Sequence, residues 1–340
     1  MLRFLLPFLC LGLSATDGFI RNTGIFNRLT PGDVVVTSDG TVYLLNADEA
    51  RVSRFDASGV LIGEFGSKGE GPGELLNAIR IAWEKDKVYV IGSPFVNVFS
   101  ADGKFEQRLR LPSEAVSVDR VRGGWLVRTR SFKDFQEAFV LADDSFDNPE
   151  TLLTFKTNMA PRKKPAFQPL QDRAFHGVSP DGGYVYLRLP ESSRIHIYDT
   201  KTRTRKHTID RNDAPLPVTG SYIDAYLEWR RARMLERGLP PRPLGDFPEY
   251  FPPIADMSVN ADGHLIIARY TPWFGEEVYH AYDMNGREVK TRFESWAQGR
   301  VVAVHGDLAY ITTFEKDRGE AGLAKVPVRE AERFVLRSAD

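Results

Sequence analysis

Residues 32–75 read GDVVVTSDGTVYLLNADEARVSRFDASGVLIGEFGSKGEGPGEL, and this stretch decides the fold. It holds four short apolar runs, Val34–Val36, Val42–Leu45, Arg51–Phe55 and Val60–Phe65. The runs are separated by turn-forming residues, Ser38-Asp39-Gly40, Asn46-Ala47-Asp48 and Asp56-Ala57-Ser58-Gly59. Short runs rich in β-branched and aromatic residues between such turns are typical of strands. The stretch therefore predicts one four-stranded antiparallel sheet.

The same pattern returns five more times along the chain, with copies that open near Ile79, Ala115, Phe175, Ile254 and Val301. Four strands per unit and a period of roughly 40–45 residues are typical of a β-propeller. A β-sandwich is the main alternative, but its turn signals would not recur so regularly. The sequence predicts an all-β fold, a six-bladed β-propeller of four-stranded antiparallel blades. We expect the segment Ile20–Leu29 to add an outer strand beside the last blade and so close the ring.

Two insertions interrupt the period. Asn158–Leu170 is rich in proline and basic residues and is interpreted as a loop. Residues 219–238, TGSYIDAYLEWRRARMLERG, have helical spacing of apolar residues and predict one helix between blades four and five. Ser221 and Asp224 fit a capping-box pattern at its start, and Gly238 fits its end.

The net charge and the N-terminal segment indicate where the protein is located and which classes of partner it does not bind. The 340-residue chain carries a formal net charge of −1, so no global field draws it to nucleic acid or to an anionic membrane. Residues 1–15 match a signal peptide whose apolar run, Phe4–Leu13, is too short to span a bilayer. We expect an extracytoplasmic monomer (periplasmic or secreted), residues 16–340 forming one propeller domain. Cys10 is the only cysteine, and as a lipid-anchor site it fits poorly because Leu9 before it is not small.

The glycine-rich segment Phe65–Leu75, FGSKGEGPGEL, resembles the connection between blades in NHL-type propellers. VYLLN followed by RVSRFDASG resembles the core of the same repeat, and residues 252–288 look like the matching unit of bacterial extracytoplasmic six-bladed propellers. The glycine segment is not a phosphate loop, because it lacks the lysine of that motif and precedes a strand. The resemblance implies the fold and frequent export. It implies no single function, because such propellers include binding scaffolds and enzymes.

Candidate site residues follow from the propeller geometry, because inner strands converge on one axis. His176 and Met257 are in register with Val34, with Arg80 near the same level. Arg128 and the pair Arg269-Tyr270 end second strands, and the insertion supplies aromatic residues that could cover the rim. The predicted ligand site at the channel mouth therefore comprises Arg80, Arg128, His176, Asp256, Arg269, Tyr270, Tyr226, Trp229 and Tyr250. The alternative is that these are polar residues lining a wet channel, and aromatic residues that fix the insertion to its domain.

Three functions remain open. The favoured hypothesis is a rigid module that binds a protein or a small-molecule ligand. The second is a metal-dependent lyase or hydrolase with one zinc or calcium ion in the channel, held by His176 with Asp256 or His305. Amidating lyases and gluconolactonase-like propellers hold metals there, but no motif matches their ligand sets. The third is a purely structural partner domain. No nucleophile, zinc or EF-hand motif is present.

Overall fold

The computed structural model describes residues 18–20, 33–156, 168–211, 213–236, 238, 240, 243–259, 263–274, 277–289, 301–305, 308–315 and 320–327. In these ranges the strands form six four-stranded antiparallel sheets, numbered here 1 to 6. Sheet 1 contains β2 (Asp33–Val36), β3 (Val42–Asn46), β4 (Arg51–Phe55) and β5 (Leu61–Phe65). Sheet 2 contains β6 (Arg80–Glu84), β7 (Lys87–Ile91), β8 (Phe95–Ser100) and β9 (Phe105–Arg110). Sheet 3 contains β10 (Ala115–Val121), β11 (Gly124–Ser131), β12 (Gln136–Ala142) and β13 (Glu150–Lys156).

Sheets 4 to 6 follow the same plan. Sheet 4 contains β14 (Phe175–Val178), β15 (Tyr184–Arg188), β16 (Ile195–Asp199) and β17 (Arg205–Ile209). Sheet 5 contains β18 (Asp256–Val259), β19 (Leu265–Tyr270), β20 (Glu277–Tyr282) and β21 (Glu288–Val289). Sheet 6 contains β22 (Val301–His305), β23 (Leu308–Glu315), β24 (Glu320–Pro327) and, outermost, β1 (Gly18–Ile20). The chain is therefore all-β with one helix among the described residues, and the predicted propeller architecture is confirmed.

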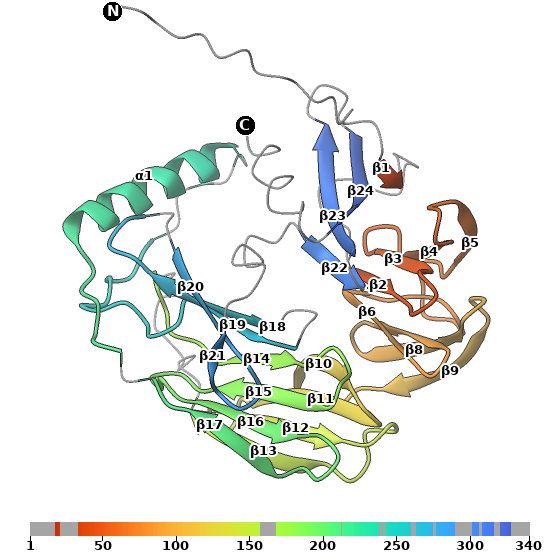
Figure 1. Ribbon diagram of the computed structural model, residues 1–340, viewed down its shortest axis with the longest axis horizontal. Helices are drawn as coiled ribbons and strands as arrows, with labels where there is room; N and C mark the ends of the chain where they lie inside the picture. The colour runs from red at the N-terminus through yellow and green to blue at the C-terminus, as the bar shows by residue number, and fades with distance from the viewer. Residues whose placement is uncertain are drawn as a thin grey trace, which may run out of the picture.

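The sheets are arranged around a common axis, with the first strand of each sheet nearest to it (Figure 1). First strands of neighbouring sheets contact one another, as β2 does with β6 and β22, and β14 with β10 and β18. The core lies between neighbouring sheets. Tyr43 and Leu45 of sheet 1 pack with Val90 of sheet 2, and Phe139 of sheet 3 packs with Leu187 of sheet 4. Burial of these faces is what holds each sheet against the next.

Strand β1 comes from the opposite end of the sequence to its neighbour. Gly18 pairs with Ala324 of β24, so an N-terminal strand completes a sheet built by C-terminal strands. An outer strand beside the last sheet is thus present, but it spans residues 18–20 and shares only Ile20 with the predicted segment. The remainder of the predicted segment, residues 21–29, lies outside the described residues, as do the predicted signal peptide and residues 158–167 of the predicted loop.

Tight turns join successive strands, as the turn-forming residues between the apolar runs predict. In the turn after β14 the amide of Gly182 donates to the carbonyl of Ser179 at 2.8 Å, and Gly182 has a φ of +67°. The Asp181 carboxylate accepts the amide of Gly183 at 2.9 Å. A left-handed φ strains residues with a Cβ, which explains the glycine at this place in the repeat.

The glycine-rich segment after β5 is a structural crossing between sheets 1 and 2. Arg108 of β9 donates to the carbonyl oxygens of Glu70 at 2.5 Å and of Glu74 at 3.1 Å. The Glu74 carboxylate accepts the amide of Gly71 at 2.7 Å. Because the segment joins β5 to β6 and its backbone carbonyls are held by Arg108, the interpretation of this segment as a connection is confirmed.

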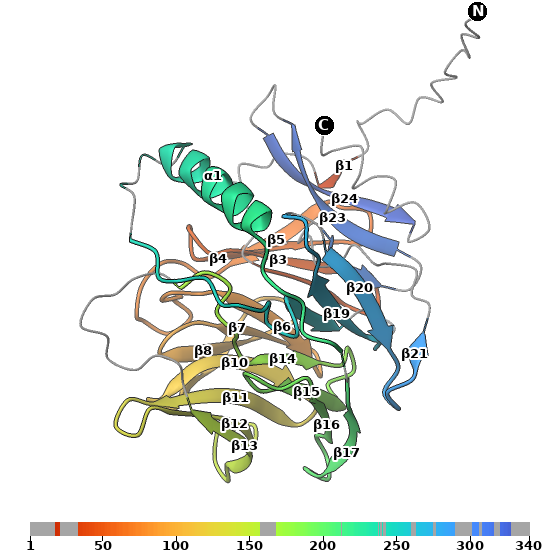
Figure 2. The ribbon, with the colours of Figure 1, turned by 90° about the vertical axis from the view of Figure 1, so that its left-hand side faces the viewer.

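The single described helix, α1 (Gly220–Glu236), lies within the predicted insertion. Its N-terminal cap is Thr219, whose Oγ1 accepts the amide of Tyr222 at 3.2 Å, rather than the predicted Ser221. The chain enters and leaves the insertion side by side, because Pro217 and Tyr250 form an antiparallel bridge. Figure 1 and Figure 2 both show α1 at the periphery of the molecule, outside the sheets. In the part of the chain described, no helix has both the length and the apolar character needed to span a membrane.

Candidate functional site

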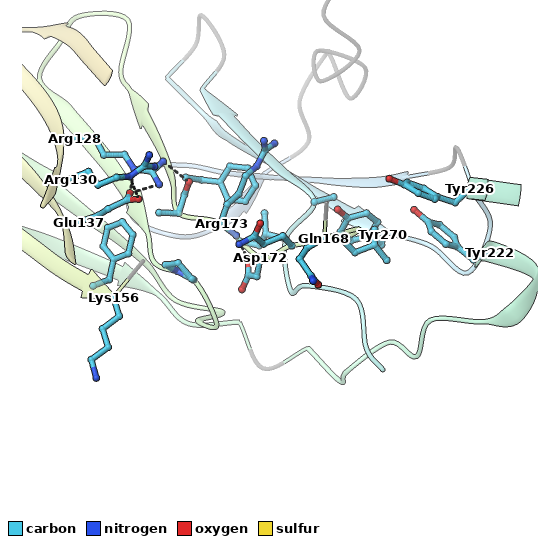
Figure 3. Close-up of a pocket in the computed structure, with 18 of the residues that line it drawn as sticks. Arg128, Arg130, Glu137, Lys156, Gln168, Asp172, Arg173, Tyr222, Tyr226 and Tyr270 are labelled. Carbon is cyan, nitrogen blue, oxygen red and sulfur yellow. Dashed lines mark hydrogen bonds and ion pairs between the residues drawn. The ribbon is translucent and has the colours of Figure 1, made fainter. Parts of the chain in front are cut away.

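A pocket of about 520 Å³ lies between sheet 3, residues 168–175 and α1, and we call it the helix pocket (Figure 3). Four of the predicted site residues line it: Arg128, Tyr226, Trp229 and Tyr270. They come from β11, α1 and β19, so the pocket exists only when the insertion lies against the propeller. Its volume is within the range of small-molecule sites in proteins.

A buried glutamate between two arginines forms one wall of the helix pocket. Glu137 on β12 is 3% exposed, and its carboxylate accepts from Arg128 Nε at 2.5 Å and from Arg130 Nε at 2.9 Å. Arg128 and Arg130 are two residues apart on β11, so both side chains lie on the same face of sheet 3. The two positive charges compensate the buried carboxylate, and the carboxylate in turn fixes both guanidinium groups.

The segment between sheets 3 and 4 forms the floor of the pocket and is held by Arg188. The Arg188 side chain is fully buried on β15 and binds both oxygens of the Asp172 carboxylate. It also donates to the carbonyl of Arg173 at 2.8 Å and to that of Ser192 at 2.8 Å. This bidentate pair ties residues 172–173 to sheet 4 and leaves the Arg173 side chain 65% exposed, above the ring of Phe175.

The other side of the pocket is aromatic. Tyr222 is buried against Phe251 and Phe274, with ring centroids 4.7 and 5.4 Å apart. Tyr270 stacks on Phe251 at 4.9 Å, and Trp229 lies 5.7 Å from Phe274. Burial raises the pKa of Tyr226, so its hydroxyl is neutral at pH 7. These contacts fix the helix to the propeller and also leave aromatic rings lining the pocket (Figure 3).

The predicted Arg80 and His176 meet near the axis instead, on a carboxylate that the sequence analysis did not single out. Asp119 of β10 binds Arg80 through Oδ1 and lies 2.8 Å from His176 Nε2 through Oδ2. Asp33 of β2 lies beside them and accepts the amides of Ile81 at 3.0 Å and Val34 at 3.1 Å. We call Asp33, Arg80, Asp119 and His176 the axial cluster, since they come from the first strands of sheets 1 to 4.

The pKa values of the two carboxylates in the axial cluster are shifted in opposite directions. Burial raises the pKa of Asp33 to about 6, against the lowering effect of its backbone hydrogen bonds and of Arg80. Burial also acts to raise the pKa of Asp119, but the hydrogen bond and charge of His176 and the charge of Arg80 outweigh it and hold that pKa below its usual value. Asp119 is therefore ionised at neutral pH, and Asp33 becomes protonated as the pH falls through about 6.

The remaining predicted residues lie apart from both groups. Asp256 lies 4.0 Å from the guanidinium of Arg173, near the edge of the helix pocket. Arg269 lies 3.3 Å from Asp213, which lines a second pocket of about 300 Å³ at sheets 4 and 5. Tyr250 is 46% exposed outside the helix pocket. The His305 side chain lies outside the described residues. Among the side chains that are described, no three His, Cys, Asp or Glu come together as a metal site.

Sequence reasoning missed Arg130, Glu137 and Arg173 of the helix pocket, and Asp33 and Asp119 of the axial cluster. One signal was available: Arg128 and Arg130 share a strand face, and Glu137 is seven residues beyond Arg130 across a hairpin. No sequence signal marks Asp172 or Arg173, since their position depends on a buried ion pair with another sheet.

No family model and no curated protein matches this sequence. Solved structures resemble it in fold. They include a Bacteroides fragilis protein that is predicted to be exported (15% identity, 88% of this chain and 90% of that one, TM-score 0.48). A luciferin-regenerating enzyme is similar as well, with 12% identity over 90% of this chain and 94% of that one and a TM-score of 0.43. So is the calcium-binding protein regucalcin of Agrobacterium tumefaciens, with 13% identity over 89% of this chain and 92% of that one and a TM-score of 0.42. With TM-scores below 0.5, these similarities carry no conclusion about function.

Proposed function

We propose that this protein is an exported six-bladed propeller that acts as a binding module for a small molecule, with its site in the helix pocket. The observation that carries the proposal is the pocket itself, a concave space of about 520 Å³ lined by charged groups and by aromatic rings. Ligand sites are concave, largely apolar and supplied with a few placed polar groups. A concave site of this size fits a small molecule better than a protein surface.

Export rests on the N-terminal sequence. Residues 1–15 have the short apolar run of a signal peptide, and the first described strand, β1, begins at Gly18. Cleavage near Ser14 or Ala15 would therefore leave every described strand in the mature protein. It would also remove Cys10 and leave a chain without cysteine, and therefore without disulfide bonds. N-terminal sequencing of the protein recovered from its host tests this part of the proposal.

Ligand-observed NMR with a library of small organic fragments tests the binding function. Ala255 lines the helix pocket, and the Ala255→Trp variant would fill part of it. We expect fragments that bind the wild type to lose binding in Ala255→Trp. A matched control is Ser145→Trp, which adds the same ring at an exposed turn of sheet 3 and should change nothing. If no fragment shows this difference between the two variants, the proposed site is wrong.

A second candidate is a metal-dependent lyase or hydrolase acting at the axial cluster. One observation favours it: Asp119 holds His176 Nε2 at 2.8 Å, and metal-binding histidines are commonly oriented by a carboxylate on their other ring nitrogen. Elemental analysis of protein purified without chelator decides it. About one equivalent of zinc or calcium that is lost in His176→Ala would support this reading, and metal-free protein would reject it.

A further inference from the structure

Resting on the proposed function, we infer that the ligand of the helix pocket is an organic anion with a flat apolar body. Its acidic group, a carboxylate or sulfonate, binds the guanidinium of Arg130. Its body lies along aromatic rings that line the pocket, Phe155, Phe175, Tyr222, Tyr226, Trp229, Tyr270 and Phe274.

The charge of the pocket wall is the first argument. Four basic residues, Arg128, Arg130, Lys156 and Arg173, and two acidic residues, Glu137 and Asp172, line it, for a formal charge of +2. The whole chain carries −1, so positive charge is concentrated here. A concave wall of one sign raises the local concentration of ligands of the opposite sign.

The two acidic residues of the wall are already paired. Glu137 is bound by both Arg128 and Arg130, and Asp172 is bound on both oxygens by the buried Arg188. Arg188 stands behind the wall and adds a further positive charge that compensates Asp172. Neither carboxylate is therefore available to bind a cationic ligand, and the charges of the wall that are not neutralised by an ion pair are positive.

Arg130 has the free donors that an anion needs. Its Nε is bound to Glu137 at 2.9 Å, while its two Nη atoms have no partner among the described residues. Arg128, in contrast, uses Nε and Nη2 on Glu137 and directs Nη1 to the Ala174 carbonyl at 3.4 Å. Two Nη groups side by side form the planar fork that binds a carboxylate or sulfonate bidentately. Because Glu137 already fixes the guanidinium, little conformational entropy remains to be lost on binding.

The aromatic side determines the rest of the ligand. Trp229 is 49% exposed, so its indole retains free surface beside the pocket. Tyr270 stacks on Phe251, which holds its ring in place, and the buried Tyr222 packs edge-on against the same phenylalanine. Rings held in this way offer flat faces that stack on another flat group. An inorganic anion would satisfy Arg130 and leave this surface uncovered, so we expect the anion to carry an apolar body.

Two fluorescent probes distinguish the contribution of the ligand's negative charge to binding from that of its apolar body. 1-Anilinonaphthalene-8-sulfonate carries a sulfonate on an aromatic frame, and N-phenyl-1-naphthylamine has the same frame without it. We expect the sulfonate to bind the wild type about tenfold tighter than the neutral probe, as one charge-assisted bidentate contact would give. Arg130→Gln should remove that difference and leave binding of the neutral probe unchanged. Arg130→Lys, which keeps the charge without the fork, should fall between them.

The controls distinguish failure of the proposed small-molecule site from failure of the inference that its ligand is an anion. Arg122→Gln removes an exposed arginine outside the pocket that pairs with Asp181, and it should not change either affinity. Ala255→Trp should weaken both probes. If Ala255→Trp weakens neither, the proposed function fails. If it weakens both but the probes bind equally, or Arg130→Gln has no effect, the pocket stands and the anion inference is wrong. Displacement of the sulfonate probe by millimolar inorganic sulfate would also overturn it, in favour of a site for inorganic anions.

Discussion

Arg130 and Glu137 stand directly opposite each other on the neighbouring strands β11 and β12, and the Nε of Arg130 donates to Oε1 of Glu137 at 2.9 Å. Cross-strand neighbours are the closest side-chain pairs in an antiparallel sheet. The carboxylate thus reaches Arg130 across the sheet and Arg128 along the same face, and it fixes the wall of the helix pocket before any ligand binds.

Glu137→Gln should lower the free energy of unfolding by roughly 2 kcal/mol, because two partly buried arginines lose their counter-charge. The loss stays below that of a fully buried pair since each arginine side chain is 20% exposed. Urea denaturation measures it. Glu106→Gln, which removes the exposed partner of Lys87, is the control and should change stability by less than about 0.5 kcal/mol. Equal effects of the two changes would show that Glu137 is not holding the arginines.

Asp33 should make the protein less stable as the pH rises from about 4 to about 6. Its pKa in the folded state is about 6, above the ordinary value of 3.8, so the folded state binds more protons in this window. Stability is then full below pH 3.8 and is lost as the pH rises through 6, by at most about 3 kcal/mol.

Asp33→Asn removes this titration and retains an uncharged acceptor. We expect the variant to match the wild type at pH 4 and to exceed it in stability at pH 7, as followed by urea denaturation across the pH range. Asp119 acts in the opposite direction, because its lowered pKa makes its contribution disappear only at acidic pH, below about 4. A wild type whose stability does not fall relative to Asp33→Asn between pH 4 and 7 would refute the raised pKa.

Thr219→Ala should destabilise the start of α1 by about 1 kcal/mol, since it removes the oxygen that accepts the amide of Tyr222. Ser221→Ala should have little effect, although the sequence pattern points to Ser221 as the cap. Amide hydrogen exchange in the first turns of the helix measures both changes locally. Faster exchange in Ser221→Ala than in Thr219→Ala would restore the predicted capping box.

Arg188→Met should cost roughly 3–5 kcal/mol, because it leaves Asp172 near the core without its counter-charge. The double variant Arg188→Met with Asp172→Leu should recover part of that loss, because it removes the stranded carboxylate as well. Urea denaturation of the two single variants and the double variant gives the coupling energy. Additive effects would mean that the pair does not hold the segment beneath the helix pocket.

The fold was largely predictable because its signals are local. The strands of sheets 1 to 5 follow runs of apolar residues, and turns such as Ser179–Gly183 favour a glycine at positive φ. The helix was predictable from spacing, with its cap placed two residues late. The site was predictable only in part. Arg128, Tyr226, Trp229 and Tyr270 do line one pocket, whereas Arg80 and His176 lie with Asp119 in another place.

The sequence by itself determined the repeated four-stranded unit, its turns and the position of the helical insertion, because each depends on residues a few places apart. Only the tertiary structure decided which charged groups meet. Arg188 reaches Asp172 sixteen residues earlier, and His176 reaches Asp119 from the neighbouring sheet. These contacts depend on how one sheet packs against the next and on where a connecting segment is fixed. A charge buried by such packing must find a partner there, whatever its distance along the chain.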